Sequence, residues 1–189
     1  VSNVVLPGPV RVYVGPESTA APANSISKGT AWGGSWVEVG LTEGGATLKT
    51  EVEKYEVMVD QYNAPVKDFI TKQTAQITFA VAESTLTQLK QAIGFGTVTS
   101  GSTESTLGVA ATDGIPTYYA VGFEIYAPGA TSSNSWYRRV IIWKGSPQAG
   151  VELKGEKGDK LMVSYEVNAL VDTTQSASEQ LFKIIDRVV

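Results

Sequence analysis

Cysteine and histidine are both absent from this 189-residue chain. Without cysteine the chain can form no disulfide, no thiolate nucleophile and no zinc–thiolate site. Without histidine it lacks the commonest general base and metal ligand of proteins. The sequence therefore predicts a protein that is not an enzyme and that needs no cofactor or metal.

Excess positive charge and long apolar runs are missing as well. The formal net charge is −4, which argues against a basic surface for gripping nucleic acid. The longest unbroken aliphatic and aromatic run, residues 140–143, is far below the ~18 apolar residues of a membrane helix. Residues 1–14 contain two prolines and do not resemble a signal peptide. We therefore expect a chain made in a cytoplasm, with no membrane contact.

What remains is the composition of a globular protein rich in turns. Hydrophobic residues make up 42% of the chain and charged residues 18%, unlike a disordered protein. Glycine, serine and threonine gather between the apolar segments, which is typical of short strands joined by turns. We expect a single domain over residues 1–189, with long loops at about 15–34, 48–68 and 94–116.

Alternation of apolar and polar residues with a period of two dominates the chain and predicts a mainly β fold. Turns are expected at 128–135 and 155–158, and residues 181–185 fit either helix or strand. Strands are expected over residues 10–14, 36–39, 46–60, 75–81, 119–125, 136–144 and 161–169.

One helix is expected over residues 86–93, where apolar side chains form a single stripe. Thr85 and Gln88 have the spacing of a capping box, and Gly94 is a suitable residue to end the helix.

The strand over residues 46–60 changes its apolar face partway along. Leu48 and Val52 share one parity, whereas Tyr55 has the other. A side-chain period of two does not change parity without an inserted residue or a bend. We therefore predict a bulge or hinge near Glu53 and Lys54.

Four carboxylates in the same segment are the strongest candidates for chemistry. Glu51, Glu53, Glu56 and Asp60 could act as acid and base or bind calcium. However, Glu51 and Glu53 share one strand face, Lys54 interrupts the run, and no Asp-x-Asp-x-Asp-Gly loop is present. The pattern favours a solvated face, or an electrostatic role in assembly.

Three further patterns carry little weight. Ser25 and Lys28 have Ser-x-x-Lys spacing, but they lie in a Gly/Pro-rich loop without companion motifs. Residues 94–96 begin like a nucleotide-binding loop, but they follow a helix and lack the third glycine. The four tryptophans and eight tyrosines could form a sugar-binding platform, yet most lie at alternating strand positions that favour core or subunit contact.

The order and spacing of several short segments resemble siphophage tail tube proteins over most of residues 36–172. The two long loops have no counterpart in that likeness. The segments that carry it are 36–40, 43–45, 51–53, 57–61, 65–66, 82–86, 119–121, 138–142, 150–153 and 169–172.

The resemblance implies a structural virion protein with a β-sandwich or barrel-like tail-tube fold and one flanking helix. Hexameric rings would stack into the phage tail tube, assembled in the host cytoplasm, and DNA would pass through the lumen without specific binding. Tape-measure, tail-tip and tail-terminator proteins would be its other partners. Residues 48–68 would reach the next ring, and Glu166 is a candidate to line the lumen. The expected assembly residues are Glu51, Glu53, Lys54, Tyr55, Glu56, Asp60, Gln61, Pro65 and Lys67.

Two alternative functions remain open at this point. One is the ring-forming tube protein of a bacterial secretion system, a structural cousin of the phage tube. The other is a secreted carbohydrate-binding β-sandwich module, in which some of the four tryptophans and eight tyrosines would stack on sugar rings.

Overall fold

Antiparallel strands are the main elements of the fold. The computed structural model describes residues 10–82, 85–112, 114–127, 130, 136–148, 151 and 162–187. The turn expected at 155–158 and most of the loop expected at 128–135 lie outside these residues. Within them the elements are β1 (Arg11–Pro16), β2 (Val37–Glu38), β3 (Thr42–Val57), β4 (Lys67–Val81), α1 (Leu86–Ile93), β5 (Thr97–Ser100), β6 (Ser105–Gly108), β7 (Tyr119–Tyr126), β8 (Tyr137–Pro147), β9 (Val163–Ala169) and β10 (Lys183–Arg187).

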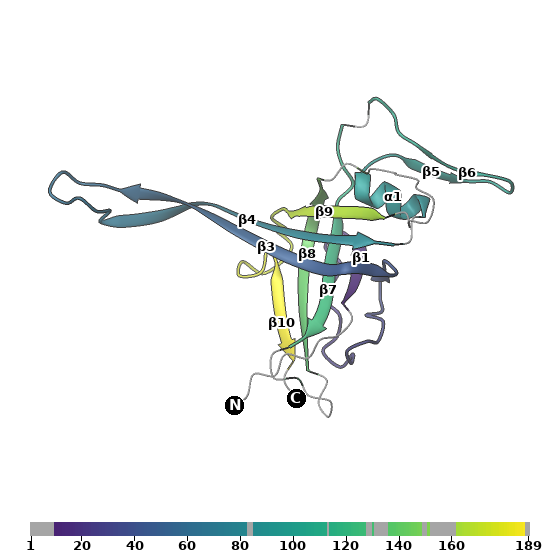
Figure 1. The fold of residues 1–189 in the computed structure, drawn as a ribbon, viewed down its shortest axis with the longest axis horizontal. Helices are drawn as coiled ribbons and strands as arrows, with labels where there is room; N and C mark the ends of the chain where they lie inside the picture. Colours follow the sequence, from purple (N-terminus) through teal and green to yellow (C-terminus); the bar gives the residue numbers. More distant parts are fainter. Residues whose placement is uncertain are drawn as a thin grey trace.

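Eight strands form one sheet that folds back on itself. Their order is β2-β1-β7-β8-β9-β4-β3, with β10 paired to β8. Strand β8 belongs to both parts of the folded sheet, because its residues 137–141 pair with β10 and its residues 145–147 pair with β9. Strands β9, β4 and β3 cross β7, β8 and β10 (Figure 1). Two crossed layers joined by a shared strand are an orthogonal packing of β-sheets. The predicted mainly β fold with one helix is confirmed.

The main core lies between the crossed layers. Ile77 and Val81 of β4 meet Val121 and Phe123 of β7, and all four are at most 3% exposed. The alternation over residues 75–81 and 119–125 therefore identifies the core-facing residues correctly. Helix α1 closes one side of this core with Leu89 and Ala92.

A second apolar cluster covers the opposite face of β1, β7 and β8. Tyr13, Trp32, Ile141 and Trp143 are all buried there. Trp32 comes from the loop between β1 and β2, so the loop expected at about 15–34 is packed onto the sheet. A Cβ atom at Gly122 would lie 2.8 Å from the Trp32 ring, which explains why glycine occupies this position.

Helix α1 has the capping interactions that its sequence predicts. The Thr85 hydroxyl accepts a hydrogen bond from the backbone N–H of Gln88, whose side chain in turn accepts one from the Thr85 N–H. Gly94 ends the helix in the left-handed conformation, with φ of 89°. No helix among the described residues is long and apolar enough to cross a membrane.

Several expected segments differ in the structure. Residues 94–116 are not one long loop, because β5 and β6 form a separate hairpin. In its turn, the Gly101 N–H donates a hydrogen bond to the Glu104 carbonyl. The segment 48–68 is mostly strand, since β3 continues to Val57 and β4 begins at Lys67. Residues of high strand propensity favour strand in both places despite the many polar residues, namely Thr97, Val98 and Thr99 in β5 and Val52, Tyr55 and Val57 in β3. Residues 181–185 fall largely in strand β10.

Strand β2 is also shorter than predicted and differs in orientation. A strand over residues 36–39 would place Val37 and Val39 on the same face, but Val37 is exposed and Val39 is buried. The reason is that the strand ends at Glu38, so the alternation does not continue to Val39.

Candidate assembly surface

The outer half of the β3–β4 hairpin projects from the body as a ribbon, here called the arm (residues 49–73). Figure 1 shows it extending far beyond the crossed layers. Strand β4 pairs with β9 only over residues 76–81, so beyond that point β3 and β4 pair with each other. Within the described chain the arm therefore has an unpaired edge on each side, and unpaired edges are sites where further strands can add.

The pairing of the arm shifts by one residue at the predicted place. Glu53 pairs with Lys72, but Lys54 pairs with Ile70, so Thr71 is the extra residue. The Thr71 hydroxyl donates a hydrogen bond to the Glu53 carbonyl oxygen at 3.2 Å. The irregularity near Glu53 and Lys54 is confirmed, although the inserted residue lies in β4.

Strand β3 itself has no inserted residue at this point, so its side chains continue to alternate. Leu48 packs against the core, and Val52 lies on the same face of the strand. Tyr55 consequently lies on the opposite face. The change of parity in the sequence thus marks the place along β3 where apolar side chains move from the face that packs on the core to the opposite face.

Exposed apolar side chains are concentrated on the arm. Tyr55 is 63% exposed, and its cross-strand neighbour Phe69 is 49% exposed. Large exposed apolar side chains gathered on one segment indicate an interaction site. The large apolar residues exposed along the arm are Val52, Tyr55, Met58, Tyr62, Val66, Phe69 and Ile70.

Ion pairs compensate many of the charges on the arm. The Lys54 ammonium lies 2.5 Å from the Asp68 carboxylate, and Lys72 lies 3.1 Å from Glu53. The hydrogen bond between Lys54 and Asp68 raises the pKa of Lys54 and lowers the pKa of Asp68. Exposed pairs of this kind contribute little to stability. They do leave the arm with few uncompensated charges to desolvate if a partner covers it.

Lys49 and Glu51 form a further pair at the root of the arm, 2.6 Å apart. Their hydrogen bond lowers the pKa of Glu51 and raises that of Lys49. In the backbone register of the ribbon, Glu56 lies opposite Asp68. The Lys67 ammonium lies 4.7 Å from the centre of the Phe69 ring.

The remaining predicted residues occupy the tip of the arm, residues 58–66, where the chain reverses. Asp60, Gln61 and Pro65 all lie there, and the Val66 N–H donates to the Val57 carbonyl. The structure therefore brings every predicted assembly residue onto one arm. Sequence reasoning missed the returning strand, whose contributions are Asp68, Phe69, Ile70 and Lys72. The run of strand-favouring residues Phe69, Ile70 and Thr71 soon after Pro65 is the signal that could have identified it.

Glu166 lies apart from the arm, on the outward face of the β3–β4–β9 layer. It is exposed and accepts a hydrogen bond from the Gln76 amide at 2.7 Å. Lys49 and Lys72 on this face are each paired with a glutamate. Glu166 therefore gives this otherwise polar face an excess of negative charge.

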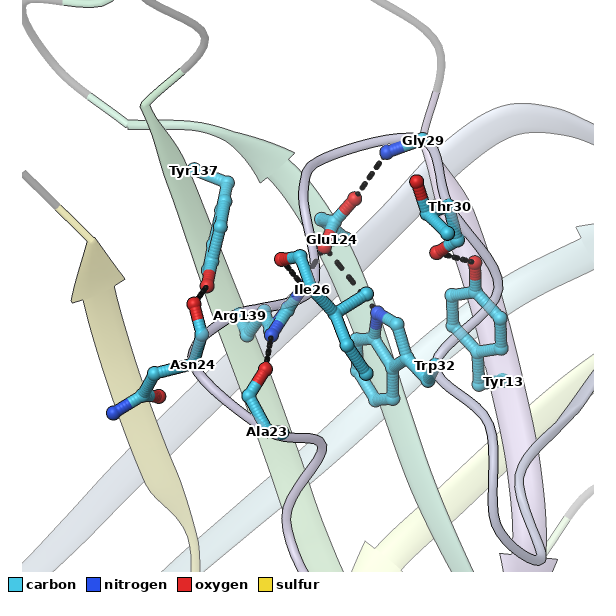
Figure 2. Close-up of polar contacts among 10 residues, drawn as sticks. All are labelled: Tyr13, Ala23, Asn24, Ile26, Gly29, Thr30, Trp32, Glu124, Tyr137 and Arg139. Carbon is cyan, nitrogen blue, oxygen red and sulfur yellow. Dashed lines mark hydrogen bonds and ion pairs between the residues drawn. The ribbon is translucent and has the colours of Figure 1, made fainter. Parts of the chain in front are cut away.

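A buried ion pair on the other layer holds the loop between β1 and β2 in place. Glu124 of β7 and Arg139 of β8 are direct cross-strand neighbours, and both side chains are at most 1% exposed. The Arg139 Nε donates to Glu124 Oε2 at 2.8 Å (Figure 2). Glu124 also accepts hydrogen bonds from the Gly29 N–H and the Trp32 indole N–H.

The guanidinium of Arg139 reaches the same loop from the opposite side. It donates to the carbonyls of Ala23 and Ile26 and lies 3.9 Å from the centre of the Tyr137 ring. The Tyr137 hydroxyl donates to the Asn24 carbonyl at 2.9 Å (Figure 2). Apart from the ion pair itself, every polar contact described for this cluster is directed at the loop, so the cluster positions the loop. Sequence reasoning missed it, because the pairing of Glu124 with Arg139 depends on strand register.

The weaker sequence patterns find no chemical setting in the structure. The Lys28 ammonium lies 3.9 Å from the centre of the Tyr126 ring. Gly94 is at the C-terminal end of α1, where carbonyl groups and not N–H groups are available to a ligand. Among the described residues no cluster of three or more Asp, Glu, His or Cys side chains could hold a metal ion.

A protein-family model described as "Phage tail tube protein" matches residues 1–185 of the chain. A search of curated proteins found no match. The matched residues include both layers of the fold, the whole arm and the Glu124–Arg139 pair.

Proposed function

Because the chain belongs to the phage tail tube protein family, we propose that its copies form hexameric rings that stack into the tail tube of a siphophage. Family membership makes the chain a structural component of the virion tail. The finer proposal is that the tube assembles in the host cytoplasm, catalyses nothing and conducts DNA during infection. Its proposed partners are further copies of itself and the tape-measure, tail-tip and tail-terminator proteins.

The open edge of the sheet supports the formation of rings. Among the residues that the structure describes, β3 is the last strand at its end of the sheet and pairs on one side only, with β4. A long unpaired edge invites pairing with another chain, and closing a ring removes such edges. Neighbouring subunits would therefore join their backbones through β3.

The arm carries the proposal that rings stack. It projects from the body, exposes large apolar side chains on both faces, and pairs off many of its own charges. A ribbon of this kind buries little within its own subunit, whereas contact with the next ring would remove that apolar surface from water.

The negative charge of the chain suits a conduit for DNA. Each subunit carries a formal net charge of −4, and a hexameric ring carries six times that charge. If the outward face with Glu166 lines the lumen, its carboxylates repel the DNA phosphates over a Debye length of about 8 Å. Such repulsion would keep DNA from adhering to the wall. The family match favours this function over the two alternatives, a secretion-system tube and a carbohydrate-binding module.

Reversing two charges on the arm tests the stacking role. The double variant Lys54→Glu, Asp60→Lys replaces exposed side chains only, so we expect a folded subunit with an unchanged melting temperature. It should not form tubes, because the reversed charges oppose contact with the next ring. Negative-stain electron microscopy of the concentrated protein would show the outcome.

The control exchanges an ion pair on the body, with Arg138→Asp and Asp186→Arg. This pair lies at 2.6 Å between β8 and β10, away from the arm, and its exchange keeps the attraction. The control should still form tubes. Tubes of normal length from the arm variant would contradict the proposed stacking role.

A further inference from the structure

A second group of exposed apolar side chains, Val37 and Ile115, lines one groove on the body, and Leu41 lies outside the lining of that groove. Val37, Leu41 and Ile115 are 66%, 69% and 80% exposed. Leu41 directly precedes β3, whereas Met58 at the arm tip directly follows it. Sixteen residues of extended strand span roughly 50 Å. The two apolar groups therefore cannot meet within one subunit.

A groove of about 590 Å³ accompanies this second group. Its walls come from the end of β1, from β2, and from the segment that leads into β7. Most of the lining is apolar, including Val14, Pro16, Val37, Ile115 and Pro116. Its volume lies in the range of about 300–1,000 Å³ in which proteins commonly bind compact apolar groups.

The charges at this groove complement those at the arm tip. Glu17 lines the groove, and the Lys144 ammonium lies 3.5 Å from it and 4.7 Å from the centre of the Tyr118 ring. Asp60 lies within the arm tip, and Lys67 is the first residue after the tip. The Glu17–Lys144 pair is partly exposed, so little free energy is lost when each side chain leaves the other for a charge on a docked chain. A docked tip can place Asp60 at Lys144 and Lys67 at Glu17.

We propose that this groove receives the arm tip of a second copy of the chain, with Met58, Tyr62 and Val66 filling it. The proposal rests on the stacking function proposed above, and adds the surface on the next subunit that the arm contacts. The contact is heterologous, because each copy offers an arm to one neighbour and a groove to another. It covers both exposed apolar groups at once.

Engineered cysteines test this contact directly, because the chain contains no cysteine of its own. Tyr62 and Ile115 are 66% and 80% exposed, so Tyr62→Cys and Ile115→Cys leave the core unchanged. Tubes of the double variant should give, after oxidation, a ladder of covalent multimers on a denaturing gel that a reductant abolishes. The control pairs Tyr62→Cys with Ile184→Cys, an exposed position on β10, and should give no ladder.

Two outcomes distinguish this proposal from the tube function itself. Tubes that give no ladder, or an equal ladder with the Ile184→Cys control, would overturn the assignment of the groove and leave the tube function standing. A concentrated wild-type chain that stays monomeric would count against both.

A charge exchange gives a second measurement of the same contact. Asp60→Lys and Lys144→Asp should each raise the protein concentration needed for tube formation severalfold. The double variant should restore it, because the opposite charges face each other again. Purely additive losses in the double variant would contradict the pairing of Asp60 with Lys144.

Discussion

The Glu124–Arg139 pair is the feature with the largest expected effect at the scale of single residues. Removing two charges from water is costly, and the pair tolerates it because the guanidinium and the carboxylate each have additional hydrogen-bond partners in the loop between β1 and β2. Loss of one partner leaves the other charge buried without compensation.

We expect Glu124→Gln to lower the free energy of unfolding by about 3–5 kcal/mol, because Arg139 stays buried and charged. Urea denaturation would measure the loss, and the tryptophan fluorescence, to which Trp32 contributes, would change on release of the loop. The matched control is Asp186→Asn, which breaks a partly exposed pair with Arg138, next to Arg139 in the chain. Its cost should stay below about 1 kcal/mol. Equal losses in the two variants would contradict the role given to burial.

Residues of this kind show where sequence reasoning stops. Glu124 occupies a polar position in an alternating strand, and such a position ordinarily faces solvent. Its burial depends on the loop around Trp32, which lies 92 residues away in the chain. Asp68 and Phe69 escaped prediction for a related reason, since their partners Lys54 and Tyr55 become evident only once the register of the hairpin is known.

At the scale of elements, helix α1 shows what local sequence can specify. Its capping box, apolar stripe and terminal glycine all lie within ten residues, from Thr85 to Gly94, and all three are present in the structure. The place of the register shift near Glu53 was also predicted from β3 alone, although the side chains of β3 keep alternating there and the shift is not the cause of its change of apolar face. The inserted residue Thr71 was not predicted, because assigning it requires knowledge of the partner strand.

Replacing Thr85 by alanine should destabilise the protein by about 1 kcal/mol, because the N–H of Gln88 loses its partner at the start of the helix. The control is Thr87→Ala, an exposed site inside the same helix. Alanine is the better helix former there, so this variant should be neutral or slightly more stable. Thermal unfolding of both variants would test the prediction. A loss for Thr87→Ala as large as that for Thr85→Ala would show that capping is not the cause.

At the scale of the whole molecule, the structure combines a well-packed body with a weakly supported arm. The body buries two apolar clusters, whereas the arm is a two-stranded ribbon with exposed side chains. Isolated ribbons of two strands are at best marginally stable in water. The stability of the free subunit should therefore reside in the body.

Hydrogen exchange would measure this difference. In free subunits we expect the amides of the arm to exchange rapidly and those of β7 and β8 slowly, because local opening is easiest where few buried contacts exist. In assembled tubes the arm amides should become protected, while the body amides change little. An arm that is already protected in the free subunit would contradict this division.

The projection of the arm from one side of the body also means that a stack of such subunits is directional. In the proposed stack, one rim would display unfilled arms and the other would display empty grooves, and no symmetry operation within the tube would exchange them. Growth at the two rims then requires different chemistry, and so does stopping it. A protein that begins the stack must mimic one of these surfaces, and a protein that caps it must mimic the other.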